Sequence, residues 1–313
     1  DGDRRIPVPY FHVFAEGDDG RKREYWMDGA DGEAAFAVSV ETAGYVHGLV
    51  TACDAEKNPL ADCDVFEGGA AAGFDRILQT GSVPSDYDVF WERVIAEELD
   101  PVAPAAVYKE EWQSGDPGDV VYDLRVACPG PNPVSGYLRM PRNAAARSLP
   151  IVVLYMGYNV TAAQVPNKGN AIQLCINQQG EPNGQSAAYY AQLLATKYAN
   201  FGFDDTENRD PDTVFFKYMV LRALQAVRYC MTLPEWDGVH VKVCGGSMGG
   251  FQAIQAAAHE ARVTEADIAI PWLCDLRAIQ SGRLGGWRPA PAAGLDYYDT
   301  VCASTCVLCP VEI

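Results

Sequence analysis

Hydrophobic and polar residues alternate over residues 239–243, and the alternation stops at a run of glycines. A period of two is typical of a β-strand with one buried face. Beyond the glycines, residues 251–260 are rich in Ala and Gln and contain neither Gly nor Pro, which favours a helix. The pattern therefore predicts a strand, a tight turn and a helix in immediate succession.

The same patterns predict an α/β domain in the larger, C-terminal part of the chain. Apolar residues recur at helical spacing over residues 212–232, so this segment should be a helix packed on a core. Further strands are predicted at 119–128, 135–140, 149–158, 267–273 and 305–313. The first two should form an antiparallel pair, and the third is apolar enough to be buried on both faces. We expect a mostly parallel sheet with crossover helices on both faces.

The N-terminal part has a different pattern. Residues 1–80 carry short strand-like runs separated by Gly, Asp and Asn-Pro turns, with no useful helical period. A chain of 313 residues is long enough for two hydrophobic cores. We therefore predict a small β-sandwich-like domain over 1–80 and the α/β domain over 81–313.

Composition and charge restrict the classes of partner. Hydrophobic residues make up 48% of the chain, which excludes disorder, and no apolar run reaches the 18 or so residues of a membrane span. The formal charge of −18 would repel nucleic acid and anionic membrane surfaces. We expect neither as a partner, whereas a neutral or cationic small substrate is compatible with this charge.

The chain begins at Asp1 without a basic and apolar leader, which is typical of a mature, processed product. We expect a secreted or periplasmic protein, with a cytoplasmic one as the alternative. Ten cysteines are too few for a disulfide-dense scaffold, although Cys53 and Cys63 bracket a short loop that one disulfide could close. The cysteines at 302–309 lack a second Cys pair or a nearby His, so no metal site is predicted.

The predicted turn carries the candidate chemistry. Its sequence has the form G-x-S-x-G, with Ser247 between a strand and a helix, which is the arrangement of a nucleophile elbow. Gly245, Gly246 and Gly249 would allow backbones to pass closely, and the amide of Met248 would point towards a developing oxyanion. The alternative is an ordinary glycine-rich turn.

Several short stretches beside this turn resemble the acetyl xylan esterase and cephalosporin C deacetylase family of α/β hydrolases. They are YMGYN at 155–159, LPEWDG at 233–238, CGGSMGG at 244–250, PWLCDL at 271–276, GRLGGW at 282–287 and YYDT at 297–300. Together they cover most of residues 85–313. The N-terminal β-rich segment is similar to the extra domain of longer, mostly exported members.

The resemblance implies that Ser247 attacks an acetyl ester while the backbone amides of Tyr158 and Met248 hold the oxyanion. The family usually has Gln where Met248 stands, and its Arg-Gly-Gln motif has no counterpart here. The first departure leaves a main-chain donor intact. The second bears on substrate range and assembly, where a homo-oligomer is one of the states to consider.

Candidate pocket residues follow from the same stretches and from the chemistry of sugars. Flat aromatic rings stack on sugar faces, and amide side chains bind hydroxyl groups. The candidates are Asn159, Pro271, Trp272 and Trp287. The alternatives are that the two Trp rings belong to the core and that Asn159 caps a loop.

No suitable general base is found among the four histidines. His240 would lie about 23 Å from Ser247 along a strand, and His259 about 18 Å away along a helix, whereas a base must come within about 3 Å. His12 and His47 belong to the N-terminal domain. In α/β hydrolases the acid and the histidine follow the serine. We therefore expect the sequence to be a piece of a full esterase, the alternatives being a silent relative or a site completed by another subunit.

The sequence as a whole predicts a serine carbohydrate esterase that removes acetyl groups from acetylated xylan or xylo-oligosaccharides through an acyl-serine, without metal or cofactor. One alternative is another α/β hydrolase, a peptidase or a dienelactone-type enzyme. The other is a catalytically silent carbohydrate-binding or structural relative.

Overall fold

The structure is a computed structural model that describes residues 8–29, 35–113 and 115–312. Contacts within the chain group it into two compact units. The first comprises Asp1–Gly81 and Arg277–Trp287, and the second comprises Ser82–Leu276 and Arg288–Ile313. The segment Arg277–Trp287, which we assigned to the second domain from the sequence, thus groups with the first.

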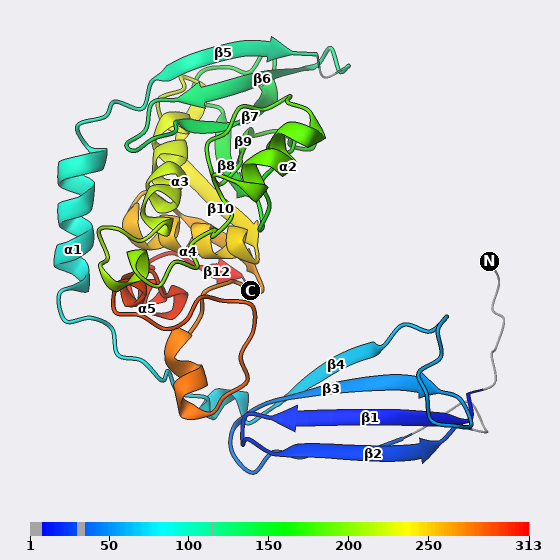
Figure 1. The fold of residues 1–313 in the computed structure, drawn as a ribbon. Helices are drawn as coiled ribbons and strands as arrows, with labels where there is room; N and C mark the ends of the chain where they lie inside the picture. The colour runs from blue at the N-terminus through cyan, green and yellow to red at the C-terminus, as the bar shows by residue number, and fades with distance from the viewer. Residues whose placement is uncertain (1–7, 30–34, 114, 313) are drawn as a thin grey trace. The chain divides into compact units, whose positions relative to one another are not determined.

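The first unit contains one antiparallel sheet with the strand order β2-β1-β3-β4 (Figure 1). The strands are β1 (Tyr10–Gly17), β2 (Lys22–Asp28), β3 (Gly44–Cys53) and β4 (Phe66–Ala72), followed by a 3₁₀ turn at Phe74–Arg76. In the described part of the unit there is no second sheet, so the predicted sandwich is wrong. The reason is a shortage of core: β2 and β4 bury none of their side chains fully, and Val13, Ala15 and Cys53 are the buried apolar residues of β1 and β3.

The disulfide considered for Cys53 and Cys63 is also wrong, because both are free thiols. Cys53 is buried, and its Sγ lies 3.6 Å from the carbonyl oxygen of Thr51, to which it donates. A short loop between two cysteines gives the right chain length for a bridge but does not fix the direction of the two Cβ atoms.

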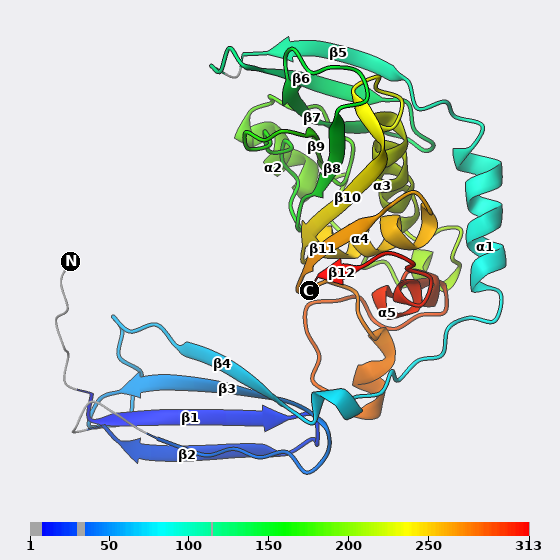
Figure 2. The same cartoon turned by 180° about the vertical axis from the view of Figure 1, so that it is seen from behind.

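The second unit is built on an eight-stranded mixed sheet with the order β12-β11-β10-β8-β9-β7-β6-β5 (Figures 1 and 2). In this order, each neighbouring pair from β12 to β9 is parallel. Each neighbouring pair from β9 to β5 is antiparallel. Their bounds are β5 Ala106–Trp112, β6 Asp119–Val126, β7 Val134–Pro141, β8 Leu149–Tyr155, β9 Ile172–Ile176, β10 Trp236–Gly246, β11 Glu265–Ala269 and β12 Val311–Glu312. The predicted antiparallel pair and central strand are confirmed as β6, β7 and β8.

Two α-helices, α3 and α4, form the main layer on this sheet. The helices are α1 Tyr87–Val94, which continues as a π-helix over Ile95–Leu99, α2 Ala187–Ala195, α3 Phe216–Cys230, α4 Met248–His259 and α5 Thr300–Ser304, with 3₁₀ turns at Glu207–Arg209, Leu276–Ser281 and Gly294–Tyr297. α3 and α4 pack side by side on one face, over buried residues such as Ile151, Val153 and Val243 (Figure 1). None of the helices in the described ranges is long and apolar enough to cross a bilayer.

The opposite face of the sheet is covered differently. It carries a small buried cluster of Val121, Tyr137, Ala163 and Cys175, while Leu154, Cys244 and Asp267 on the parallel strands remain half-exposed. In the described ranges, the chain between β8 and β9, residues 156–171, is irregular and supplies no crossover helix. The prediction of helices on both faces is therefore not met over β8, β10 and β11.

Candidate active site

Ser247 occupies a tight turn between β10 and α4. Its backbone has φ 55° and ψ −120°, a conformation that costs a non-glycine residue on the order of 1–3 kcal/mol. The amide of Ser247 donates to the carbonyl of Ala269 at 2.9 Å, and its carbonyl accepts from the amide of Trp272 at 2.9 Å. The side chain is half-exposed and makes no capping hydrogen bond to α4, the usual role of serine at this position. The turn thus presents a hydroxyl that neither packs in the core nor caps the helix.

The glycines of the turn differ in how strictly they are required. A Cβ on Gly245 would lie 2.3 Å from the backbone of Gly249, and one on Gly249 would lie 2.2 Å from the carbonyl oxygen of Tyr155. Gly246 is less constrained, since the nearest atom to its Cβ would be 3.7 Å away. Gly250 was not singled out from the sequence, yet a Cβ there would be 3.0 Å from Pro271. Close approach of α4 to the ends of β8 and β11 explains this pattern.

The two predicted oxyanion donors lie at the same edge of the sheet. Met248 is the first residue of α4, where backbone amides have no partner within the helix and the helix end carries partial positive charge. Its side chain is fully buried. A Cβ on Gly157 would lie 3.5 Å from the carbonyl oxygen of Gly246, so the loop after β8 runs directly beside the turn. Tyr158 is the next residue of that loop, with its ring packed edge-on against Phe201 at 4.6 Å between centroids.

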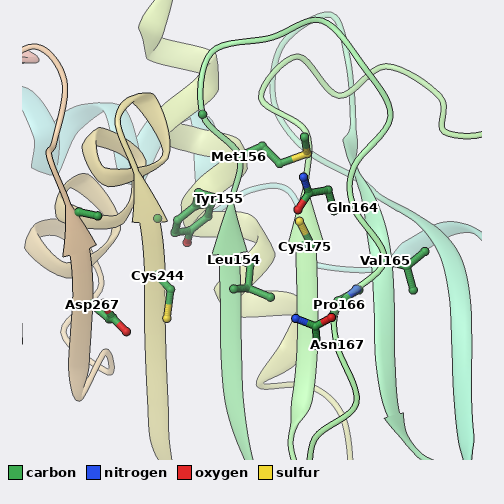
Figure 3. A pocket seen from close by; sticks show the side chains of 13 residues that line it. Leu154, Tyr155, Met156, Gln164, Val165, Pro166, Asn167, Cys175, Cys244 and Asp267 are labelled. Atoms are coloured by element: carbon green, nitrogen blue, oxygen red, sulfur yellow. The ribbon is translucent and has the colours of Figure 1, made fainter. Parts of the chain in front are cut away.

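A cavity of about 440 Å³ adjoins this turn on the face of the sheet that α3 and α4 leave open (Figure 3). Side chains from three neighbouring strands, Leu154, Cys175 and Cys244, point into it beside those of the loop after β8. The whole lining consists of Leu154, Tyr155, Met156, Gly157, Gln164, Val165, Pro166, Asn167, Cys175, Cys244, Gly245, Asp267 and Ala269. The cavity thus reaches Gly245, two residues before Ser247.

Comparison with known proteins decides the family. A sequence profile described as acetyl xylan esterase (AXE1) matches residues 77–285, more than half of the chain. The chain belongs to the acetyl xylan esterase family. It is also 26% identical over 247 residues to the acetyl esterase Axe7A of Xylanibacter ruminicola, a match that covers 74% of this chain and 55% of the relative. The chain therefore spans about half the length of this curated relative.

Solved structures of acetyl xylan esterases share the fold. The enzyme from Paenibacillus sp. R4 superposes with a TM-score of 0.54 at 21% identity, covering 74% of this chain and 78% of that one. Acetyl xylan esterase 1 from Thermoanaerobacterium sp. JW/SL YS485 gives a TM-score of 0.55 at 19% identity, covering 74% and 79%. Both likenesses concern the architecture of the α/β unit.

The predicted pocket residues of this family member do not line the cavity. Trp272 packs edge-on against Phe216 and Phe251, at centroid distances of 5.3 and 6.3 Å, as the core alternative had it. Pro271 contacts the first turn of α4. The side-chain oxygen of Asn159 accepts a hydrogen bond from the amide of Val160 at 2.8 Å, so Asn159 caps the loop, as its alternative interpretation had it. Trp287 is 52% exposed and belongs to the other unit.

All four histidines lie in described ranges, and each is engaged elsewhere. His240 is exposed on β10, with its Nδ1 2.7 Å from Asp237. His259 ends α4, one full helix away from Ser247, and stacks on Trp91 at 4.4 Å. In the first unit, His12 bonds Glu24 and His47 bonds Glu67. As expected, His240 is separated from Ser247 by the second half of β10, and His259 by the whole of α4.

His259 gives a prediction about pH, since burial lowers its pKa from 6.5 to about 3. The folded chain keeps this ring neutral while the unfolded chain protonates it, so stability should fall as the pH drops from about 6.5 to about 3. The slope is about 1.4 kcal/mol per pH unit for one proton. Urea unfolding at pH 7 and pH 4.5 should show a clearly smaller loss for H259F than for the natural residue. Asp88, Glu92 and Asp100, which line the same pocket as His259, are kept in both proteins, so equal losses would contradict the assignment.

Sequence reasoning missed the polar loop after β9. Asn177, Gln178, Gln179 and Asn183 are almost fully buried there and hydrogen-bond within this loop or to neighbouring loops. The signal was a run of amide side chains directly after the apolar residues 171–176, at the carboxyl edge of a parallel strand. Over the described residues, no group of three or more His, Cys, Asp or Glu side chains is arranged to hold a metal ion.

Proposed function

We propose that the chain carries the nucleophile and oxyanion-binding part of a serine carbohydrate esterase that removes acetyl groups from acetylated xylan or xylo-oligosaccharides. The observation that carries the proposal is the strained turn at Ser247, beside the first amides of α4 and the loop after β8. Backbone strain of this kind is kept where the surrounding structure enforces it, often at active sites. Membership of the acetyl xylan esterase family supports the choice of reaction and substrate.

In the proposed reaction, Ser247 Oγ attacks the acetyl carbonyl carbon and loses its proton to a general base. The carbonyl oxygen becomes an oxyanion that the amides of Met248 and Tyr158 stabilise by hydrogen bonds. The bond to the sugar oxygen then breaks, and the base returns the proton to that oxygen. Water attacks the acetyl-serine in the same way and releases acetate. The sequence of steps draws on no metal and no cofactor.

The general base of this proposal is neither His240 nor His259, because both are held away from the turn. We propose that the histidine and its acid are supplied by residues outside the 313 of this sequence. The oxyanion hole and the serine alone would leave only residual rate enhancement. The experiments below therefore use the natural protein.

Release of acetate tests the proposal. The natural protein should liberate acetate from acetylated xylo-oligosaccharides and hydrolyse 4-nitrophenyl acetate much faster than the matching long-chain ester or an acetanilide. Membership of the acetyl xylan esterase family is the reason for the expected preference for a small acyl group. Preference for the amide or the long-chain ester would instead indicate a peptidase or another α/β hydrolase.

A catalytically silent carbohydrate-binding relative is the second candidate. The observation that favours it is the absence of a histidine beside Ser247 among the residues of the second unit. Such a protein would bind acetylated xylo-oligosaccharides without releasing acetate, so the same assay combined with a binding measurement separates the two functions.

A further inference from the structure

Three buried glutamines hold the loop that follows β8. Gln178 Nε2 donates to the carbonyl oxygen of Met156 at 2.9 Å and also to that of Gly157. Gln252 Nε2 donates to the same Met156 oxygen at 3.1 Å, and Gln179 Nε2 donates to the oxygen of Asn159 at 2.9 Å. All three glutamines are at most 1% exposed. Three successive parts of the loop are therefore fixed by side-chain amides.

The bond to Gly157 determines the direction of another group. The carbonyl of Gly157 and the amide of Tyr158 belong to the same planar trans peptide, in which C=O and N–H point in opposite directions. Once Gln178 holds the oxygen on one side, the N–H of Tyr158 must point to the other. The loop lies beside the turn of Ser247, and the Tyr158 amide is one of the two donors in the proposed function.

Gln178 is itself rigidly placed. It follows β9 by two residues, and Ile176 at the end of that strand is paired with Tyr155 at the end of β8, so Gln178 lies level with Gly157. The guanidinium of Arg222 on α3, buried and only 5% exposed, donates from Nε to the backbone oxygen of Gln178 at 2.8 Å. A residue held by β9 and α3 can impose a fixed orientation on a loop that has no regular structure of its own.

Gln252 connects the loop after β8 to the first turn of α4. Its Nε2 donates from α4 to the carbonyl oxygen of Met156. The same Nε2 also donates to the carbonyl oxygen of Met248, one turn earlier in the helix, at 3.1 Å. The Oε1 atoms of Gln252 and Gln179 are buried without a partner among the described residues. Leaving a buried acceptor unsatisfied costs free energy, and both side chains nevertheless direct their N–H groups at the loop and the helix.

We propose that Gln178 is a positioning residue of the esterase, which acts through the Gly157–Tyr158 peptide to aim the Tyr158 amide at the oxyanion. The inference rests on the proposed function, because it assigns a role in that reaction. Loss of one oxyanion donor typically lowers kcat by about 10²–10³-fold. Misorienting the donor should give an effect of this kind with little change in KM, because the contact is made in the transition state.

The chain offers a matched control in Gln225. This glutamine is also fully buried, and its Nε2 also bridges two carbonyl oxygens, those of Val102 and Ala127, each at 2.9 Å. Its Oε1 likewise lacks a partner in the described chain. Neither carbonyl belongs to the loop after β8, so Q225M removes the same kind of bond from a place without a role in catalysis.

The test compares Q178M and Q225M with the natural protein in hydrolysis of 4-nitrophenyl acetate and in thermal unfolding. Both variants should lose similar stability. Q178M should lower kcat about 100-fold with KM within about twofold, while Q225M leaves kcat within about twofold. Equal kcat values in the two variants would overturn the inference while leaving the esterase proposal intact. A natural protein that fails to hydrolyse the ester would instead overturn the proposed function.

A second variant guards against misfolding of Q178M. In Q178E the ionised carboxylate faces two carbonyl oxygens, whereas the protonated acid can donate to one of them. Its kcat relative to the natural protein should therefore rise as the pH falls from 7 to 5. A ratio that is independent of pH would count against an orienting role for this side chain.

Discussion

Replacing Ser247 by alanine in the natural protein is expected to lower kcat for acetyl ester hydrolysis by at least about 10⁴-fold, because the nucleophile of the acyl-serine pathway is removed. The fold should persist, since the bonds that hold the turn are made by the backbone amide and carbonyl of this residue. Steady-state kinetics with 4-nitrophenyl acetate, together with circular dichroism, measure both expectations.

S304A is the matched control for that experiment. Ser304 lies in the same unit, is exposed on α5, and uses its hydroxyl to donate to the oxygen of Val301 at 2.7 Å. Its replacement should leave kcat within about twofold. An S247A variant that retains more than a few per cent of the natural rate would mean that another group performs the attack.

Replacing Gly249 by alanine is expected to destabilise the second unit by about 1–3 kcal/mol, as overpacking of a close-packed site typically does. The new Cβ would lie 2.2 Å from the carbonyl oxygen of Tyr155, a backbone atom that can yield only if β8 and α4 separate. The separation would also displace the amide of Met248. Urea unfolding should therefore show lower stability, and the kinetic assay should show a lower kcat.

The direction of the change in stability distinguishes steric overlap from helix propensity. A glycine within a helix is normally improved by alanine, by roughly 0.5–1 kcal/mol, so helix propensity alone would give the opposite result. G118A is the control: Gly118 is exposed in the same unit, and the nearest atom to its Cβ would be a side-chain oxygen of Asp116 at 3.3 Å. A stabilised G249A would show that the contact between α4 and β8 is looser than described.

Local patterns in the sequence were sufficient for elements that are long or have a clear period or composition. The strand, turn and helix around Ser247 lie where they were predicted, as β10 and α4. The helix predicted over 212–232 is α3, Phe216–Cys230. In β10 the alternation matches the burial of Val241 and Val243, whereas α3 and α4 are buried on nearly all sides and were identified by their spacing and composition.

Elements without such a period were missed. β5 is an edge strand with mostly exposed, charged residues, and β9 has only five residues between two loops. The same limitation explains the wrong sandwich, because alternation identifies a strand but does not say how many sheets the strands form. Edge and short strands are specified by their neighbours in the sheet rather than by their own composition.

The site was predicted from the sequence only where a motif restricts the backbone. The G-x-S-x-G pattern led to Ser247 and to two glycines whose replacement the structure cannot accommodate. Aromatic character led to Trp272, whose ring is packed against Phe216 and Phe251. The role of Gln178 depends on carbonyl groups of a loop more than 20 residues earlier in the chain, and no local pattern contains that information.

We propose that the hydroxyl of Ser247 is an activated nucleophile facing two backbone amides. Treating the natural protein with a fluorophosphonate and locating the modified residue by peptide mass spectrometry tests this claim most directly. We expect a single adduct on the peptide that contains Ser247, lost in S247A and retained in S304A. An unmodified Ser247 in a protein that still releases acetate from its substrate would contradict it.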